Sequence, residues 1–150
     1  MTNGGAARPP RFFPTRFQEN IHDHRHSFLD RAAKLADDEL SQFTGSEHWY
    51  RHWLARNILF TDGAKYVADE GGAYWLLDEI AFAQRGQKRV AREEFQVWKL
   101  TVKPNRTATL ACEDGNHRTV FKKEIEFTDF PIERIELWFE NNTIYLPSER

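Results

Sequence analysis

Hydrophobic and polar residues alternate with a period of two along the second half of the chain. Trp98, Leu100 and Val102 share one face of a strand that begins near Phe95 and ends before Pro104. Later segments repeat the pattern at Ala108, Leu110 and Cys112, at Phe121, Ile125 and Phe127 (with Lys123 as an exception), at Ile135, Leu137 and Phe139, and at residues 144–146. Because the connections are short, we expect an antiparallel meander with one buried face.

A helical period appears in the first half. Ala73, Leu76, Leu77 and Ile80 mark one face of a helix over residues 73–84, and apolar residues continue around most of its circumference. Such a helix is buried on more than one side, so we expect it to cover the sheet. The acidic residues of this helix, Asp78 and Glu79, are expected to face the solvent. In the alternative interpretation, Asp78 lies beside the cluster of histidines and arginine earlier in the chain.

Two earlier segments allow alternative assignments. After a Ser27 cap, apolar residues at helical spacing from Leu29 to Phe43 predict one long helix, or a break near Leu35 followed by a second short helix from Asp37. The apolar runs 58–60 and 64–68 flank Thr-Asp-Gly at 61–63, which predicts a hairpin. A helix over residues 64–69 is the alternative.

These elements predict an α+β fold. We expect a sheet of about four to six strands packed against one or two helices in two layers. The 150 residues suffice for one domain, over residues 27–150. Residues 1–26 hold several Gly and Pro residues and read as a disordered or arm-like N-terminal extension.

Composition excludes several functional classes. A net charge of −2 argues against a strongly basic nucleic-acid-binding protein. The single Cys112 permits no intrachain disulfide, which fits a cytoplasmic location. We expect no membrane span and no signal peptide, because no long apolar run is present. No nucleophile elbow or phosphate-binding loop is visible, so we expect no cofactor, and Cys112 reads as an inert core residue.

The stretch Gly45–Trp53 is the densest in side chains that combine apolar area with directed polar groups. The candidate binding residues are Glu47, His48, Trp49, Tyr50, Arg51 and His52, with Asp62, Tyr74 and Asp78 from later segments. On a helix, His48 and His52 would share a face and could hold a metal with Glu47 or Asp62. Trp49 stands where the zincin motif needs glutamate, so a metalloprotease is excluded. The simpler interpretation buries Trp49 and Trp53 while the polar residues bond to nearby loops.

Two weaker candidates lie outside that stretch. The N-terminal extension interleaves arginines with phenylalanines (Arg8, Arg11, Phe12, Phe13, Arg16, Phe17 and Arg25), a mixture that can bind stacked bases. His22, His24 and His26 alternate and would share one face of a strand, where they could hold a metal. The basic segment Arg85–Arg92 reads as a solvated linker, with nucleic-acid binding as the alternative.

Several motifs resemble a known family. They are Phe43–His52 (FTGSEHWYRH), Leu59–Gly63 (LFTDG), Gly72–Asp78 (GAYWLLD), Phe95–Val102, Thr128–Pro131 and Leu146–Ser148. Together they resemble a family of small bacterial proteins known only as a domain of unknown function, found in cyanobacteria and other bacteria and in plasmid or phage settings. The resemblance covers roughly residues 35–150. It implies a compact cytosolic domain from accessory genes, and no activity.

Three functions follow as hypotheses. The first is a non-enzymatic protein-interaction protein, an accessory or counter-defence factor of a mobile element, because aromatic and arginine side chains anchor interfaces. The second is a small metal-binding protein or enzyme that uses His48 and His52. The third is nucleic-acid binding through the Arg/Phe-rich N-terminal extension, which predicts strong salt dependence.

Overall fold

The computed structural model describes residues 28–150. The predicted N-terminal extension, its histidines and the Ser27 cap lie outside the described residues. The described chain forms one seven-stranded sheet in the order β1-β2-β7-β6-β3-β4-β5. The strands are β1 (Trp49–Arg51), β2 (Leu59–Thr61), β3 (Phe95–Val102), β4 (Ala108–Glu113), β5 (Thr119–Ile125), β6 (Arg134–Glu140) and β7 (Thr143–Tyr145).

The α+β class is confirmed, but the sheet has seven strands, more than the four to six expected, and it is not purely antiparallel. β2 and β7 run parallel, while the other neighbouring strands pair antiparallel, so the sheet is mixed. Strand β1 holds three residues, and a segment this short shows no clear alternation, which is why the sequence pattern did not reveal it. Strand β2 overlaps the apolar run 58–60 that was expected to form a strand, but it pairs with β1 and β7 and not with residues 64–68.

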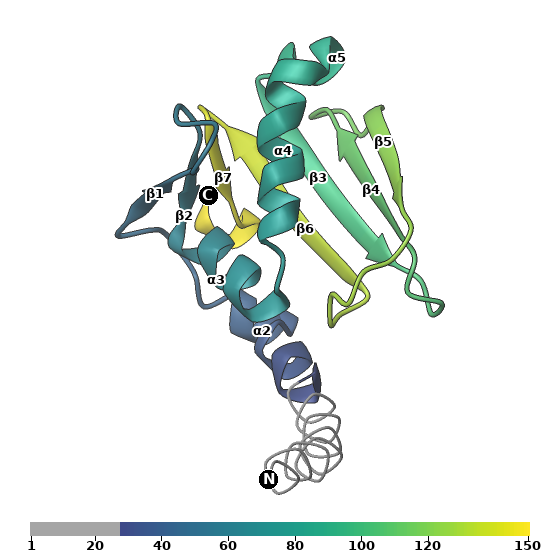
Figure 1. The fold of residues 1–150 in the computed structure, drawn as a ribbon. Helices are drawn as coiled ribbons and strands as arrows, with labels where there is room; N and C mark the ends of the chain where they lie inside the picture. The colour runs from purple at the N-terminus through teal and green to yellow at the C-terminus, as the bar shows by residue number, and fades with distance from the viewer. Residues whose placement is uncertain (1–27) are drawn as a thin grey trace, which may run out of the picture.

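Helices form the second layer. They are α2 (Asp37–Leu40), α3 (Asp62–Gly71), α4 (Tyr74–Gly86), α5 (Lys88–Ala91) and the 3₁₀ helix η1 (Pro147–Glu149). Residues 28–34 are also helical, and a turn at Leu35 separates them from α2, as the two-helix alternative predicted. Figure 1 shows the helices gathered on one face of the sheet, with α4 crossing it. Residues 88–91, expected as a linker, form α5.

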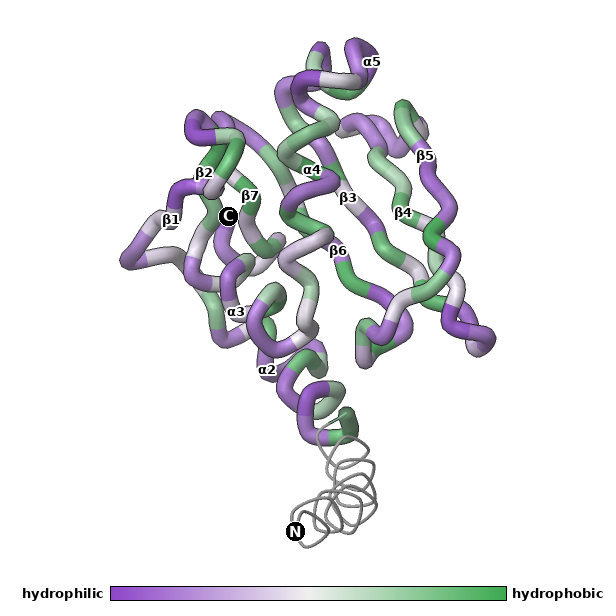
Figure 2. The backbone as a smooth tube through the Cα atoms, viewed as in Figure 1, coloured by the Kyte–Doolittle hydropathy of each residue, from purple (hydrophilic) through white to green (hydrophobic). Residues whose placement is uncertain are grey.

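The predicted central helix is confirmed as α4. It buries Leu76, Leu77 and Ile80, together with two alanines, in one core with Trp98 and Leu100 of β3. Each such aliphatic side chain contributes roughly 1.5–3 kcal/mol when it leaves water. Figure 2 shows the corresponding alternation of hydrophobic and hydrophilic residues along β3, β4 and β6.

The predicted hairpin around Asp62-Gly63 is wrong. Thr61 is extended (φ −86°, ψ 175°), and its hydroxyl accepts a hydrogen bond from Ala64 N, so it is the N-cap of α3. The hairpin instead joins β1 to β2, with Trp49 opposite Thr61. A second boundary also differs, because β5 ends at Ile125 and Phe127 is 70% exposed.

A buried polar network closes the junction between α4, α5 and β3. Gln96 is fully buried, and its amide exchanges hydrogen bonds with Gln84 (2.8 and 2.9 Å). It also donates to the carbonyls of Val90 and Glu93 and accepts from Trp98 Nε1 (3.0 Å). Satisfied networks of this kind fix one arrangement of the packed elements, because an unpaired buried polar group is costly.

Candidate functional site

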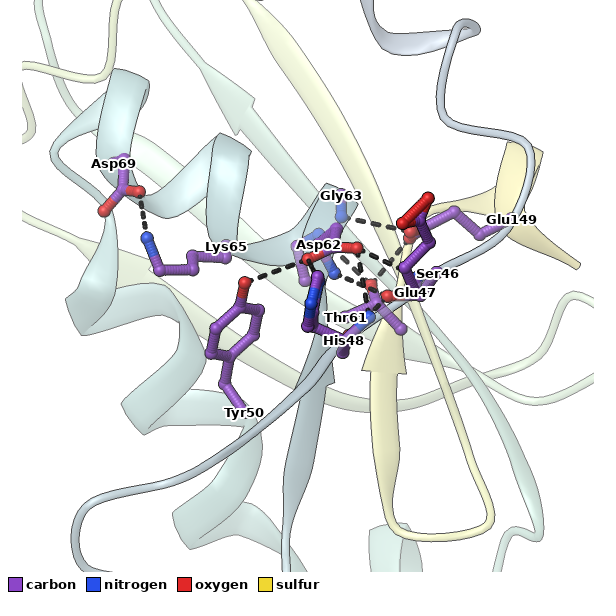
Figure 3. Close-up of polar contacts among 11 residues, drawn as sticks. Ser46, Glu47, His48, Tyr50, Thr61, Asp62, Gly63, Lys65, Asp69 and Glu149 are labelled. Atoms are coloured by element: carbon purple, nitrogen blue, oxygen red, sulfur yellow. Dashed lines mark hydrogen bonds and ion pairs between the residues drawn. The ribbon is translucent and has the colours of Figure 1, made fainter.

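Asp62 organises the beginning of the aromatic stretch (Figure 3). As the first residue of α3, it accepts hydrogen bonds at Oδ2 from the backbone N–H groups of Glu47 (3.0 Å) and His48 (3.2 Å). Its Oδ1 accepts from the Tyr50 hydroxyl (3.0 Å), and its own N–H donates to Ser46 Oγ (2.9 Å). Asp62 therefore holds the backbone of residues 47 and 48 and the side chains of Ser46 and Tyr50.

The same contacts set the protonation of Asp62. Partial burial opposes its ionisation, but the hydrogen bonds from Glu47 N, Tyr50 Oη and His48 N outweigh burial and lower its pKa below the ordinary value of 3.8. Conversely, the bond to Asp62 and partial burial raise the pKa of Tyr50. Tyr50 is therefore a hydrogen-bond donor at neutral pH, not a base.

The lowered pKa of Asp62 predicts a pH-dependent contribution to stability. The contribution is fully present above the unfolded-state pKa of 3.8 and is lost as the pH falls through the lower folded-state pKa. Asp62→Asn keeps the shape of the side chain and removes the charge. We expect the melting temperature of the variant to lie below that of the wild type at pH 7, and the gap to shrink below about pH 3.8. A gap that is constant from pH 7 to pH 2.5 would contradict this role.

Glu149 binds the same end of α3 from the opposite side (Figure 3). Its carboxylate accepts hydrogen bonds from the Thr61 hydroxyl (2.7 Å), Gly63 N (3.0 Å) and Leu146 N (2.8 Å). A negative charge at a helix N-terminus is also favoured by the helix dipole. Hence the TDG motif at 61–63 and the segment that begins Leu146-Pro147-Ser148 form one structural unit, which we call the α3 lock.

A cleft of about 490 Å³ lies beside the Asp62 carboxylate, between Phe43, Tyr50 and Tyr66. Two of its charged residues pair with each other: Lys65 Nζ bonds Asp69 Oδ2 at 2.8 Å and lies 5.5 Å from the centre of the Tyr50 ring. Burial and its bond to Asp69 raise the pKa of Tyr74, another predicted site residue. These paired groups offer no activated nucleophile or base.

His52 occupies a different environment. It is fully buried, and its Nε2 lies 2.8 Å from Asp78 Oδ1. Its Nδ1 accepts hydrogen bonds from the N–H groups of Leu54 (3.2 Å) and Ala55 (2.9 Å). Because Nδ1 accepts these hydrogen bonds, Nε2 carries the hydrogen and donates a hydrogen bond to Asp78 Oδ1. The favoured solvent-facing interpretation of Asp78 is thus incomplete: its side chain is 34% exposed and also bonds to His52.

The pairing of His48 with His52 on one helix face is wrong. Strand β1 separates them, and His48 lies 3.7 Å from Asp62, with its side chain 69% exposed. Both ring nitrogens of His52 already have partners within the protein. Within residues 28–150, no group of three or more His, Cys, Asp or Glu side chains is arranged to hold a metal ion.

The cysteine is equally unsuited to catalysis. Cys112 points into the core of the sheet and is fully buried. Burial and the neighbouring carboxylates of Glu93, Glu113 and Asp114 raise the pKa of its thiol to about 12. A thiol that stays protonated is a poor nucleophile.

The expected burial of the two tryptophans is also wrong. Trp49 is 55% exposed and Trp53 is 40% exposed. On edge strand β1, Tyr50 stacks on Phe60, so Trp49 and Arg51 point to the opposite face. Arg51 is exposed, and its guanidinium donates to the carbonyl of Arg56.

Trp53 belongs to an exposed surface that the sequence did not reveal. Its ring stacks on His52 (centroids 4.1 Å apart), and Phe82 meets the same imidazole edge-on at 5.7 Å. Leu54, on the loop that His52 holds, is 65% exposed, and Phe82 is 43% exposed. Trp53, Leu54 and Phe82 are called the His52 surface below. One feature of the sequence could have indicated this surface. The helix α4 is apolar around most of its circumference, and a sheet covers only one side of a helix, so some apolar residues of α4 must remain exposed.

Residues 34–150 match the family described as "Family of unknown function (DUF6876)". The chain belongs to this family. Comparisons with curated proteins and with solved structures give no match.

The DUF6876 match includes every predicted site residue from Glu47 to Asp78. Within it, the structure gathers most of those residues in two places, while Trp49 and Arg51 point to the opposite face of β1 from Tyr50. Glu47, His48, Tyr50 and Asp62 belong to the α3 lock and its surroundings, while His52 and Asp78 support the His52 surface, and Tyr74 lies beside Trp53 (centroids 5.4 Å apart). No helix among residues 28–150 has the length and apolar character needed to cross a membrane.

Proposed function

We propose that this DUF6876 domain is a non-enzymatic protein-interaction module that binds its partner through the His52 surface. The observation that carries the proposal is that two partly exposed aromatic rings, Trp53 and Phe82, pack on one buried imidazole, next to the exposed Leu54, whose backbone N–H binds the same ring. Exposed apolar groups that gather in one place characterise contact sites, whereas single scattered ones do not. Aromatic side chains at such sites supply much of the binding energy.

The His52 surface is held in place before any partner arrives. The hydrogen bonds from Leu54 N and Ala55 N to His52 fix the loop, and Asp78 fixes the imidazole. Trp53 is further restrained by Tyr74 and Phe60 (centroids 5.4 and 6.1 Å away). Anchors that are already ordered lose less entropy on binding, which raises affinity.

The surface also specifies the chemistry of the partner. Its centre requires apolar or aromatic side chains. Asp78, whose Oδ1 accepts from His52, remains one-third exposed at the rim. A lysine, arginine or amide donor of the partner can therefore pair with its carboxylate. We further propose that the domain acts in the cytoplasm as an accessory factor of a mobile element, which accords with the resemblance of its FTGSEHWYRH and GAYWLLD motifs.

The metal or enzyme hypothesis has less support. The described residues offer no triad of metal-ligating side chains, and both nitrogens of His52 have partners. Nucleic-acid binding through the N-terminal Arg/Phe segment concerns residues outside the described part. It keeps its own test, which is binding that weakens steeply with salt.

Leu54→Glu tests the proposal directly. Leu54 is 65% exposed, so the variant should fold with an unchanged melting temperature, while a charge in an apolar contact should reduce partner capture by about tenfold or more. The matched control is Phe127→Glu, because Phe127 is 70% exposed and lies beyond the end of β5. The measurement is affinity capture from host lysate with nuclease, read by mass spectrometry. Equal capture by both variants would contradict the site, and loss of all capture with nuclease would favour nucleic-acid binding.

A further inference from the structure

Among the described residues 28–150, strand β5 is an edge of the sheet and pairs only with β4. It holds seven residues, Thr119–Ile125, and lies last in the strand order (Figure 1). An edge strand presents a row of backbone donors and acceptors that another strand can bind. Its opposite counterpart, β1, holds three residues and offers a much shorter edge.

The hydrogen-bond alternation shows which residues of β5 face outward. Lys103 N donates to Thr107 O (2.8 Å) at the end of the β3–β4 ladder, so the odd-numbered residues of β4 bond toward β3 and the even-numbered ones toward β5. Ala108, Leu110 and Cys112 stand opposite Ile125, Lys123 and Phe121. The backbone N–H and C=O groups of Lys122 and Glu124 therefore point away from the sheet.

The side chains of β5 divide between two faces. Phe121, Lys123 and Ile125 lie on the helix-covered face, where Lys123 Nζ bonds Glu79 Oε2 of α4 at 2.7 Å. Lys122 and Glu124 lie on the opposite face and are exposed. Lys122 has no ion-pair partner within residues 28–150, and Glu124 meets only Lys103, at 3.8 Å, as an ion pair.

We propose that a second copy of this chain pairs antiparallel with β5, about a two-fold axis at Lys123, and joins the two sheets into one. In this register Lys122 lies opposite Glu124 of the second copy, and Glu124 lies opposite Lys122 of the second copy. Phe121 meets Ile125 of the second copy on the other face, also twice. The outward backbone groups of Lys122 and Glu124 form the hydrogen-bonded pairs.

Charge complementarity selects both the occupant and the register. The proposed register places Lys123 opposite Lys123 of the second copy, but each of these lysines already pairs with Glu79 of its own chain. Moving the two-fold axis to Lys122 would instead place Lys122, which has no ion-pair partner within residues 28–150, against itself and Phe121 against Lys123, and like charges directly opposite are unfavourable. Lysines in an edge strand normally prevent pairing. Here Glu79 neutralises Lys123 within its own chain, and the second copy supplies the carboxylate for Lys122. Such self-complementarity is the property of a two-fold interface.

The interface consists of two short strands, so we expect a weak dimer. Stable complexes bury about 1,200 Å² or more, and a pair of edge strands without further contacts falls near or below that value. A dissociation constant in the micromolar range follows. The proposal concerns a different strand from the His52 surface and does not rest on the proposed function.

A charge-swap cycle at two exposed positions tests the pairing. Sedimentation velocity of the full chain over the micromolar range would compare the wild type with Lys122→Glu, Glu124→Lys and the double variant. Each single swap places like charges opposite each other twice and should weaken dimerisation by about tenfold or more. The double variant restores both pairs and should dimerise within about threefold of the wild type. Matching circular dichroism spectra would confirm that all four proteins are folded.

Each outcome decides the proposal. Weakening by both single swaps with recovery in the double variant supports pairing about Lys123. A wild type that stays monomeric up to several hundred micromolar overturns it, since the expected affinity would be missed by about a hundredfold. A dimer that ignores the single swaps, or that the double variant does not restore, overturns the interface because the contact then lies elsewhere.

Discussion

Replacing Gly63 with alanine is expected to destabilise the domain by about 3 kcal/mol. A Cβ atom at this position would lie 2.5 Å from Glu149 Oε1 and 2.7 Å from Leu146 Cδ1. Leu146 is buried in the core, and Glu149 is held by hydrogen bonds from Thr61, Gly63 and Leu146. Neither can move aside without loss of packing or of the α3 lock. Urea unfolding, followed by tryptophan fluorescence, measures the change.

Two further variants separate the close contact from a general effect of the substitution. Gly86→Ala is the matched control, because nothing lies within 4 Å of its added Cβ and alanine favours the helix more than glycine does. It should leave stability unchanged or raise it. If Glu149 is the obstacle, Gly63→Ala combined with Glu149→Ala should cost less than the sum of the two single variants. Additive costs would show that the α3 lock does not govern this position.

Replacing His52 with alanine is expected to cost a similar amount, about 3 kcal/mol. The variant leaves the N–H groups of Leu54 and Ala55 and one oxygen of Asp78 without their partner, and it removes the ring on which Trp53 stacks. His52→Asn should cost less, since an asparagine oxygen can occupy the place of Nδ1 and accept from the same two N–H groups. Thermal and urea unfolding provide the comparison.

The His52 series also tests the metal hypothesis. A ligand histidine contributes stability mainly when its metal is bound. The cost of His52→Ala should therefore be the same with and without a chelator. A cost below about 1 kcal/mol in the presence of chelator, rising when zinc is added, would contradict the structural role assigned to this residue.

The long elements of the fold could be predicted from the sequence because their patterns are local. The alternation around Trp98 and Leu137 and the helical spacing of Leu76 and Ile80 persist over several residues, and burial on one side enforces them. The signal at Thr61-Asp62-Gly63 was ambiguous, because Asp-Gly is favoured in a tight turn and a threonine followed by aspartate also begins a helix. Glu149, far away in the chain, binds Thr61 and Gly63 at the start of this helix and stabilises it there.

Part of the candidate site could also be predicted, because several of its residues are neighbours in the sequence. The density of aromatic and polar residues from Glu47 to His52 marked a region whose side chains the structure connects to Asp62 and Asp78. Which polar groups meet depended on the fold: Asp78 reaches His52 across 26 positions, and Asp62 reaches Glu47 across 15. Phe82 and Leu54 are apolar, so nothing in the sequence marked them as exposed residues. Their exposure depends on the positions that α4 and the loop after His52 take in the folded protein.

The α3 lock has a consequence for how the chain folds as it is synthesised. Thr61 and Glu149 are 88 positions apart, and β2 cannot pair with β7 until Thr143 and Ile144 have left the ribosome. Closing so large a loop is entropically costly and slows folding. The nascent chain therefore carries β1 and β2, with the apolar rings of Tyr50 and Phe60, unprotected until β7 has been synthesised. Chaperone binding to nascent chains should be strongest while this segment waits for its last strand.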